Sequence, residues 1–300
     1  WESFVREWAK NATFLFERGF MEYHADRFED ASLMVYEGGR LIGLFPAASQ
    51  GRTFASHPGL TYGGLLLDRE IKLDKALKAF EAVWEYLKSL GFSEVAYKAI
   101  PNCYKVGIAE EEELALLQAN AQVEKVYTFS VVDQSWRLPY QQRRRRGVKK
   151  ATKYGLVIRE GHSFQPFWEK VLKPHLQERF GTKPVHNLAE IELLAERFPS
   201  NISQFDIYQG DAIIAGCTIF ESRQVAHTQY IASTARGRET AALDFLFDYL
   251  IQERYAHKPY FDLGSSNQGF NGEPINQSLI DWKEGFGART MLQKHYRVKL

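Results

Sequence analysis

The sequence of 300 residues contains little cysteine and no run of apolar residues long enough to cross a membrane. A spanning helix needs about 18–20 consecutive apolar residues, so we expect no transmembrane segment. The two cysteines, Cys103 and Cys217, form no C-x-x-C pair, which excludes a disulfide framework and fits a reducing compartment. The histidines show no H-E-x-x-H spacing, so we predict no metal site.

The chain also has almost no net charge, and its sequence shows no pattern of a secretory leader. Lys and Arg number 38 against 37 Asp and Glu, so the net charge of +1 gives no overall attraction to nucleic acid or to an anionic membrane. The sequence opens with Trp1-Glu2-Ser3 and shows no charged segment followed by an apolar one, which a signal peptide would have. We therefore expect a cytoplasmic protein. Its oligomeric state cannot be deduced from these features.

Apolar residues, by contrast, are plentiful. They make up 45% of the chain and aromatic residues 14%, which is enough for a full core and excludes intrinsic disorder. At about 150 residues per domain, the length corresponds to one large domain or two ordinary ones.

One order of predicted elements occurs twice in the chain. Each copy contains helices, a hairpin of two strands, an extended segment, a helix, a strand, a helix and a last strand. The hairpins are 32–48 and 204–220, and each turns at residues typical of tight turns. The later elements are 60–67, 73–89, 93–99, 109–119 and 122–132 in the first copy, and 225–233, 239–254, 259–264, 275–285 and 289–299 in the second. The opening helices are 1–9 and 17–25, then 140–153, 164–180 and 187–198, the last with Asn187 and Glu190 placed as a capping box.

The matched elements keep a nearly constant spacing of about 165–172 residues. A shared order at a shared spacing is the signature of an internal repeat. We therefore predict two α/β modules, residues 1–133 and 134–300.

A basic stretch lies near this junction. Residues 137–159 contain nine Arg and Lys residues and no acid. Arg143, Arg146 and Lys150 are three or four residues apart and share one face of the predicted helix 140–153, as does Lys153. Clustered cations favour phosphate or pyrophosphate binding, and RNA binding by the same contacts. The alternative is a solvated helix face.

The element order of each module resembles the GNAT acyltransferase fold. Two such modules in one chain resemble the Fem-type peptidyltransferases and the related BioF2-like acetyltransferase-domain proteins of bacteria. The segments that carry the resemblance are 57–67 (HPGLTYGGLLL), 143–155 (RRRRGVKKATKYG), 183–187 (KPVHN), 227–233 (HTQYIAS), 261–269 (FDLGSSNQG) and 279–288 (LIDWKEGFGA). The resemblance implies an α/β (α+β) fold of two tandem GNAT-like modules, each a mixed, mostly antiparallel sheet flanked by helices.

The resemblance also implies a carrier site. The family's acyl-CoA loop carries Arg or Gln, then Gly and a second Gly or Ala, before a helix. Here Arg236, Gly237 and Arg238 occupy that position, without the second glycine at its usual spacing. A helix N-terminus favours an anion such as a pyrophosphate, so we predict cofactor binding there, with an ordinary turn as the alternative.

Two residues are expected where the fourth strand of the second module separates from the fifth. The resemblance implies that Tyr230 acts as a general acid to the leaving thiolate and that Gln229 holds the acyl group's oxygen. A strand alternates its faces, so only one of them can point into the cleft. The alternative is a buried aromatic residue beside an edge amide.

Three further residues complete the predicted site of the second module. Asp262, at the end of a predicted strand, could take the proton from an attacking amine, or it could orient an arginine. Ser265 follows in a Gly-Ser-Ser run that either contacts the substrate or forms a turn. For Lys283 the resemblance implies a place near the transferred group; the alternative is a helix end that Gly285 and Gly287 terminate.

In the first module the run Tyr62-Gly63-Gly64 is a candidate substrate contact. Glycines let a substrate backbone approach closely, but they also occur at bulges in apolar strands. The loop histidines His57 and His186 are expected to be packed or solvent-exposed rather than catalytic, and both cysteines are expected to be inert.

Three functions follow from these patterns. The first is an N-acyltransferase that moves an acyl group from acyl-CoA (acetyl-CoA) to an amine on an anionic acceptor, such as a cell-envelope sugar or peptide precursor. The second is a Fem-like ligase that uses aminoacyl-tRNA to extend a peptidoglycan precursor, with tRNA as a partner. The third is an inactive double-GNAT scaffold that binds an anionic ligand or a protein.

Overall fold

The computed structural model describes residues 1–267 and 274–300. The chain forms two compact units. Unit 1 comprises Trp1–Thr128, Asn267–Ile275 and Met291–Leu300, and unit 2 comprises Phe129–Ser266 and Asn276–Thr290. Both units therefore contain residues from both halves of the chain. The predicted modules, 1–133 and 134–300, are by contrast continuous in sequence, and the boundary between them stays a prediction.

Unit 1 is built on a mixed sheet. The order of its strands is β1-β4-β5-β7-β14-β8, and β2, β3 and β6 form a small separate sheet. The strands are β1 (Glu29–Asp30), β2 (Leu33–Glu37), β3 (Arg40–Phe45), β4 (Ala47–Gln50), β5 (Thr53–Ser56), β6 (Leu66–Leu67), β7 (Glu94–Lys98) and the parts of β8 (Gln122–Asp133) and β14 (Arg289–Lys299) that belong to this unit. The helices are α1 (Arg18–Met21), α2 (Leu73–Ser89) and α3 (Glu111–Gln118). Of the pairs β1–β4, β4–β5, β5–β7 and β7–β14, β5–β7 alone is parallel.

Unit 2 repeats this plan. Its strand order is β8-β13-β12-β11-β10-β9, and here β12–β13 alone is parallel. The further strands are β9 (Leu156–Gly161), β10 (Ile202–Gln209), β11 (Ala212–Glu221), β12 (Val225–Ser233) and β13 (Tyr260–Ser265). The helices are α4 (Gln142–Ala151), α5 (Gln165–Phe167), α6 (Lys173–Phe180), α7 (Leu188–Arg197), α8 (Ala235–Glu239), α9 (Ala242–Tyr249) and α10 (Gln277–Glu284). Each unit therefore has the mixed, mostly antiparallel sheet with flanking helices that the sequence predicts.

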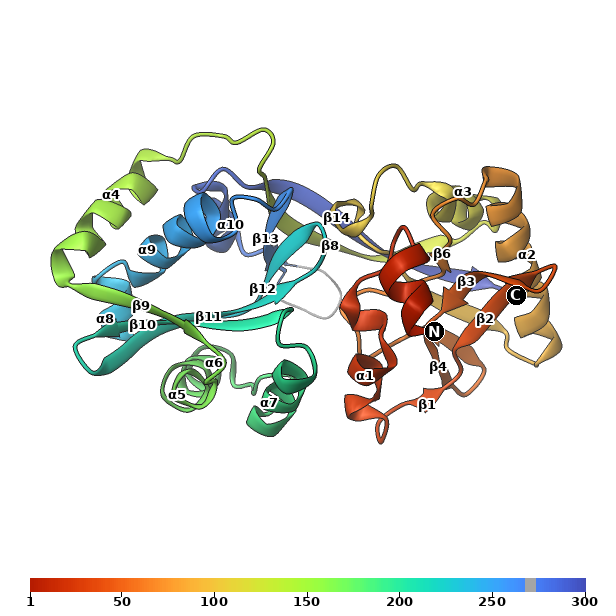
Figure 1. Cartoon of the computed structure of the whole chain (residues 1–300), viewed down its shortest axis with the longest axis horizontal. Coiled ribbons are helices and arrows are strands. Elements are labelled where there is room, and N and C mark those ends of the chain that lie inside the picture. The colour runs from red at the N-terminus through yellow and green to blue at the C-terminus, as the bar shows by residue number, and fades with distance from the viewer. Residues whose placement is uncertain (268–273) are drawn as a thin grey trace. The chain divides into compact units, whose positions relative to one another are not determined.

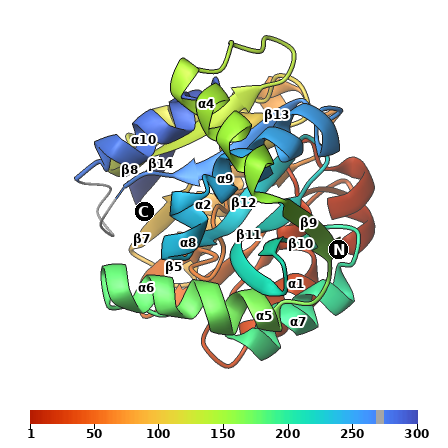
Figure 2. The same ribbon diagram turned by 90° about the vertical axis from the view of Figure 1, so that its left-hand side faces the viewer.

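The helices of unit 2 cover both faces of its sheet. α4, α9 and α10 lie on one face, and α5, α6 and α7 lie on the other (Figure 1, Figure 2). Leu246, Phe247 and Leu250 pack with Phe205 and Phe261 into the core under α9. Each such side chain contributes about 1.5–3 kcal/mol when it is fully buried. In unit 1, α2 covers the corresponding core around Phe45, Phe54 and Val95.

Local sequence explains most element bounds. The apolar periodicity of 73–89 gives α2 at those residues, and β12 and β14 occupy 225–233 and 289–299 as predicted. The Asn187 side chain accepts from the Glu190 amide and the Glu190 carboxylate accepts from the Asn187 amide, which confirms the capping box of α7.

Other predictions of elements were right only in part. The helix 239–254 begins at Ala242 as α9 and continues through a π-helical turn to Arg254; Ala241, whose φ is 57°, separates it from α8. The segments 1–9 and 17–25 are helical as predicted, with a π-helical turn at Phe4–Trp8 and with α1 followed by a 3-10 turn at Glu22–His24, but the predicted extended segment 60–67 contains only β6. The strands β4, β5 and β9 were not predicted. β9 is a largely exposed edge strand, so its sequence lacks the apolar alternation that identifies a half-buried strand.

In the described part of the chain, no helix is long and apolar enough to span a membrane.

Candidate functional site

The parallel strands β12 and β13 separate in the middle of unit 2. They pair at Val225–Tyr260, Ala226–Phe261 and His227–Asp262. Beyond that point no pairing between them occurs among the described residues, although β12 continues to Ser233 and β13 to Ser265. Along the opening, the facing backbone groups of β12 and β13 do not bond to each other. They are therefore available to a ligand, and ligands commonly bind at the carboxyl ends of parallel strands.

His227 and Asp262 lie at the start of this opening. Ala226 and Phe261 point into the core under α9, so by alternation His227 and Asp262 point to the opposite face. Asp262 Oδ2 is 2.9 Å from His227 Nδ1, and Asp262 Oδ1 accepts a hydrogen bond of 2.7 Å from the amide of Gly264. The carboxylate is fully buried. A carboxylate that accepts two hydrogen bonds holds the imidazole with its proton on Nδ1, so Nε2 carries the lone pair.

Lys283 reaches the same turn from α10. Its ammonium donates to the carbonyl oxygens of Gly264 and Ser265, at 2.8 Å and 2.7 Å. The residue is only 2% exposed. Burial lowers the pKa of Lys283 to about 8, while the charge of Asp262 opposes that shift. Gly264 joins the two groups because its amide binds Asp262 and its carbonyl binds Lys283; its φ of 76° is one that glycine adopts without strain.

Two buried hydroxyl groups lie in the same segments. Thr228 Oγ1 and Ser266 Oγ have no hydrogen-bond partner among the described residues. Buried hydroxyls usually have a partner, so an unpartnered pair at a strand opening is available to bind a ligand.

The predicted pair Gln229 and Tyr230 follows on β12. Thr218 pairs with Tyr230 and Ile219 with Thr228, so Gln229 is the extra residue of a β-bulge. The Tyr230 hydroxyl accepts from the His186 amide at 3.0 Å and lies 2.7 Å from His186 Nδ1. Tyr230 is buried against Trp168, while Gln229 is half-buried. His186, which we expected to be packed or solvent-exposed rather than catalytic, is therefore a direct partner of a predicted catalytic residue.

The equivalent place in unit 1 carries no such groups. β5 and β7 pair in parallel at Thr53–Glu94, Phe54–Val95 and Ala55–Ala96. Phe54–Val95 in unit 1 and Ala226–Phe261 in unit 2 both lie in the core and are therefore equivalent. The next pair along the strands is Ala55–Ala96 in unit 1 and His227–Asp262 in unit 2. The titratable pair is thus a feature of unit 2.

The predicted carrier loop is engaged in contacts within the protein. Arg236 donates to Gln209 at 2.9 Å and forms an ion pair with Glu239, and Arg238 donates to the carbonyl of Ser233. The Thr234 side chain caps the amide of Gly237. A Cβ at Gly237 would lie 2.3 Å from the carbonyl oxygen of Ile214, so this glycine serves the packing of α8 on β11. The loop therefore fits a pyrophosphate only after these contacts rearrange.

The basic helix α4 presents most of its cations to solvent. Arg143, Arg146 and Lys150 are exposed, and Arg145 and Lys149 are exposed beside them. Arg144 differs, because its guanidinium is buried in an ion pair with Asp244. One arginine thus anchors the helix on α9, and the other cations of α4 form an exposed basic surface, hereafter the α4 basic face.

The run Tyr62-Gly63-Gly64, a candidate substrate contact in the first module, is part of the core of unit 1. Tyr62 is buried and its hydroxyl binds Thr13 at 3.1 Å. A Cβ at Gly63 or Gly64 would meet Ser56 or the Tyr97 hydroxyl at 3.0 Å and 2.5 Å. Packing accounts for both glycines; a contact with substrate stays a prediction.

Sequence reasoning missed His227 as a site residue, although it lies in the segment 227–233. Its partner Asp262 is 35 positions away, and only the pairing of β12 with β13 brings the two together. Ser265 ends β13 beside the opening, and its carbonyl accepts from Lys283; its contact with substrate stays a prediction. Gln268 and Gly269 of the segment 261–269 lie outside the described residues.

The described residues contain no group of three or more His, Cys, Asp or Glu side chains that could hold a metal ion.

The fold is similar to that of several solved transferases. FemX superposes with a TM-score of 0.69 at 11% identity, covering 100% of this chain and 95% of that one. The C-terminal domain of a lysylphosphatidylglycerol synthetase from Agrobacterium fabrum gives 0.63 at 14% identity, covering 100% and 89%. L-PGS from Bacillus licheniformis gives 0.60 at 12%, covering 95% and 92%. No protein-family model and no curated protein matches the sequence. The likeness to FemX confirms the predicted Fem-type fold.

Proposed function

We propose that this protein is an N-acyltransferase that moves an acyl group from an activated carrier to an amine, at the opening between β12 and β13. One observation carries the proposal: a buried carboxylate, Asp262, orients His227 where two parallel strands separate. A base held by a carboxylate is the arrangement that removes a proton from an attacking amine. The transferases of similar fold support the reaction class.

The reaction needs one proton to leave and one to be supplied. The amine nitrogen attacks the acyl carbon, forming the new C–N bond, and His227 Nε2 takes the nitrogen's proton. Asp262 then stabilises the imidazolium. As the bond from the acyl carbon to the carrier breaks, Tyr230 gives the leaving group its proton and regains one from solvent, while His186, whose Nδ1 lies 2.7 Å from that hydroxyl, orients it.

Charge that develops on the acyl oxygen also needs donors. Amides of β12 beyond His227, in the bulge at Gln229, lie along the opening and would donate to that oxygen. Lys283 holds the Gly264–Ser265 turn and adds a positive charge beside Asp262. Thr228 and Ser266 would bind the acceptor through their unpartnered hydroxyls.

Acyl-CoA is the first candidate carrier. Arg236 and Arg238 would bind its pyrophosphate after release from Gln209 and Ser233. The acceptor would be an anionic envelope precursor that Arg143, Arg146 and Lys150 hold by its phosphates. In this proposal the protein acts in the cytoplasm.

Aminoacyl-tRNA is a second candidate carrier, and the α4 basic face favours it. Five exposed cations on one short helix suit a nucleic-acid backbone. The name lysylphosphatidylglycerol synthetase, carried by a domain of similar fold, also describes an aminoacyl group joined to an acceptor.

The test compares both carriers directly. Acetyl-CoA, with free CoA as control, and an aminoacylated tRNA, with uncharged tRNA as control, are titrated while the melting temperature is recorded. A ligand at about 100 times its Kd adds roughly 2.7 kcal/mol, which is a readable shift. Transfer to a panel of amines is then measured with whichever carrier binds. Asp262→Asn should bind the carrier and lose transfer, whereas binding of neither carrier contradicts the proposal.

A matched pair of variants separates the carriers. Replacing Arg143, Arg146 and Lys150 by alanine should weaken tRNA binding at least tenfold and flatten its salt dependence, if tRNA is the carrier. The control replaces Lys72, Lys78 and Lys88, which are equally exposed on or beside α2. It removes the same charge and should leave tRNA binding unchanged. An inactive scaffold predicts ligand binding without transfer to any amine in the wild-type protein.

A further inference from the structure

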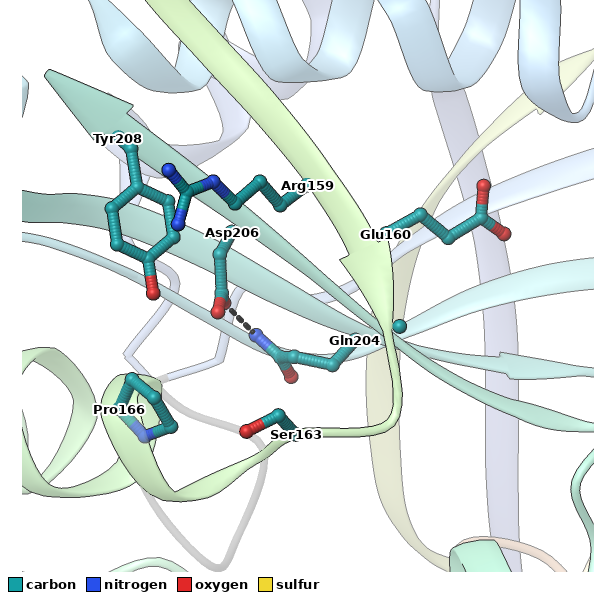
Figure 3. A pocket seen from close by; sticks show the side chains of 8 residues that line it. Arg159, Glu160, Ser163, Pro166, Gln204, Asp206 and Tyr208 are labelled. Carbon is teal, nitrogen blue, oxygen red and sulfur yellow. Dashed lines mark hydrogen bonds between the residues drawn. The ribbon is translucent and has the colours of Figure 1, made fainter. Parts of the chain in front are cut away.

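A second site lies in unit 2, between the sheet edge and the start of α5. A cavity of about 270 Å³ is lined by Arg159, Glu160, Gly161, Ser163, Pro166, Gln204, Asp206 and Tyr208. Figure 3 shows Asp206, Gln204 and the Tyr208 hydroxyl pointing into the space between the strands and Pro166, whereas Glu160 points away from it. None of these residues belongs to the proposed transfer site.

Asp206 forms the floor of this cavity. It is 6% exposed, and its Oδ1 accepts a hydrogen bond of 2.7 Å from Gln204 Nε2. Gln204 is fixed in turn, because its Oε1 accepts from the Thr218 hydroxyl at 2.7 Å. The other carboxylate oxygen has no hydrogen-bond partner among the described residues, and Asp206 forms no ion pair there. Burial raises the pKa of Asp206 to about 6, so the group is mostly ionised at pH 7.

A cation and an aromatic ring stand above Asp206. The Arg159 guanidinium lies 4.1 Å from the centre of the Tyr208 ring, and Arg159 is paired with Asp206 across β9 and β10. Arg159 is exposed and forms no ion pair with a carboxylate of the described residues. The neighbouring Glu160 is ion-paired with Arg254 instead. The cavity thus offers a buried negative group and, at its rim, a positive one.

We propose that this cavity binds a free α-amino acid, with the ligand's ammonium on Asp206 and its carboxylate on Arg159. Asp206 is buried without an ion pair, and the charge of Arg159 offsets the cost of its burial only in part, so an ammonium ligand bound to the carboxylate would be stabilising. A planar guanidinium held over an aromatic ring suits bidentate contact with a carboxylate. The volume lies below the roughly 300–1,000 Å³ of sites for drug-sized ligands, which favours a ligand the size of one amino acid over a nucleotide.

Calorimetric titration with a set of small probes tests the proposal. Glycine, L-alanine, L-serine and L-lysine carry both charged groups, L-alaninamide lacks the carboxylate, and N-acetyl-L-alanine lacks the ammonium. At least one of the four amino acids should bind with millimolar or better affinity, and the two derivatives should bind at least tenfold more weakly than L-alanine or not at all. No binding of any amino acid at 10 mM overturns the proposal. Equal binding of the two derivatives and L-alanine also overturns it.

Three variants locate the binding. Asp206→Asn keeps the oxygen that accepts from Gln204 and should lose at least tenfold in affinity; Arg159→Gln, at an exposed position, should do the same. The matched control Glu160→Gln removes a neighbouring charge that points away from the cavity and should bind as the wild type does. Unchanged binding in Arg159→Gln and Asp206→Asn would place the ligand elsewhere and refute the site. The outcome is independent of acyl transfer, because His227 and Asp262 remain intact in all three variants.

Discussion

His227 and Asp262 share a hydrogen bond of 2.9 Å at the last paired position of two parallel strands. The corresponding position of unit 1 holds Ala55 and Ala96. The repeat therefore preserves the strand plan in both units but keeps titratable side chains in one. Because of this difference, we place the proposed chemistry in unit 2. Four predictions follow from contacts within that unit.

The first concerns Asp262. Asp262→Asn should lower kcat by roughly 10²–10⁴-fold, because general base catalysis contributes about that much and the amide no longer fixes the proton of His227 on Nδ1. The variant should fold, since Asn retains an oxygen that accepts from the Gly264 amide. Steady-state kinetics check this, with Asp211→Asn in the exposed β10–β11 turn as the control.

His227→Gln extends the same prediction. If the two residues act as one unit, the double variant should be no slower than the slower single variant. If the fold-losses in kcat of the two single variants multiply in the double variant, the residues act separately.

Lys283 should make stability depend on pH. Its pKa in the folded protein is about 8 against 10.5 when exposed, so the unfolded chain binds more protons between these values and stability rises with pH across that window. From pH 7.5 to 9.5, the unfolding free energy of the wild type should gain about 2 kcal/mol relative to Lys283→Met. Urea unfolding at both pH values measures this difference. The exposed Lys78→Met should follow the wild type at both, and a flat difference for Lys283→Met contradicts the prediction.

The anchor of α4 should matter for folding. The side chains of Arg144 and Asp244 are 7% and 9% exposed, and Asp244 also accepts from Trp282 Nε1 at 3.0 Å. Arg144→Met leaves a buried carboxylate without its cation and should cost about 3–5 kcal/mol of unfolding free energy. Arg145→Met, at an exposed position on the same helix, should cost less than about 0.5 kcal/mol. Adding Asp244→Leu should restore much of the loss; equal stability of the two single variants would refute a structural role for this pair.

A variant at Gly237 distinguishes a packing role of this glycine from a role in ligand binding. Gly237→Ala should lower the melting temperature without any ligand, because the new Cβ would lie 2.3 Å from a backbone oxygen of β11. Overpacking of this kind costs about 1–3 kcal/mol. Gly161→Ala, whose Cβ would meet nothing within 4 Å, is the control. A variant at Gly237 that melts like the wild type but loses carrier binding would show that the glycine serves the ligand instead.

Local patterns determined the elements of this protein. The periodicity of 73–89, the alternation of 225–233 and the cap at Asn187 each act within one or two turns of chain, so they can be read directly from neighbouring residues. The repeated order of elements predicts the two-module organisation, and Asp262 and Ser265 were expected at a strand end by the same reasoning, whereas for Lys283 the family resemblance implied a place near the transferred group. The basic face of α4 was equally visible, since helix spacing alone brings its cations together.

Tertiary structure decided which of these groups meet. His227 acquires its role from a parallel pairing with a strand 35 residues later, and no local pattern encodes that register. Arg144 is buried among exposed arginines because α9 supplies Asp244, and the cavity floor at Asp206 exists because β9 pairs with β10 and α5 covers the face. Residues 291–300 belong to unit 1 for a similar reason: their strand pairs with β7, about two hundred positions earlier in the chain. Short-range periodicity specifies the elements, whereas long-range pairing and burial choose the partners that give a side chain its chemistry.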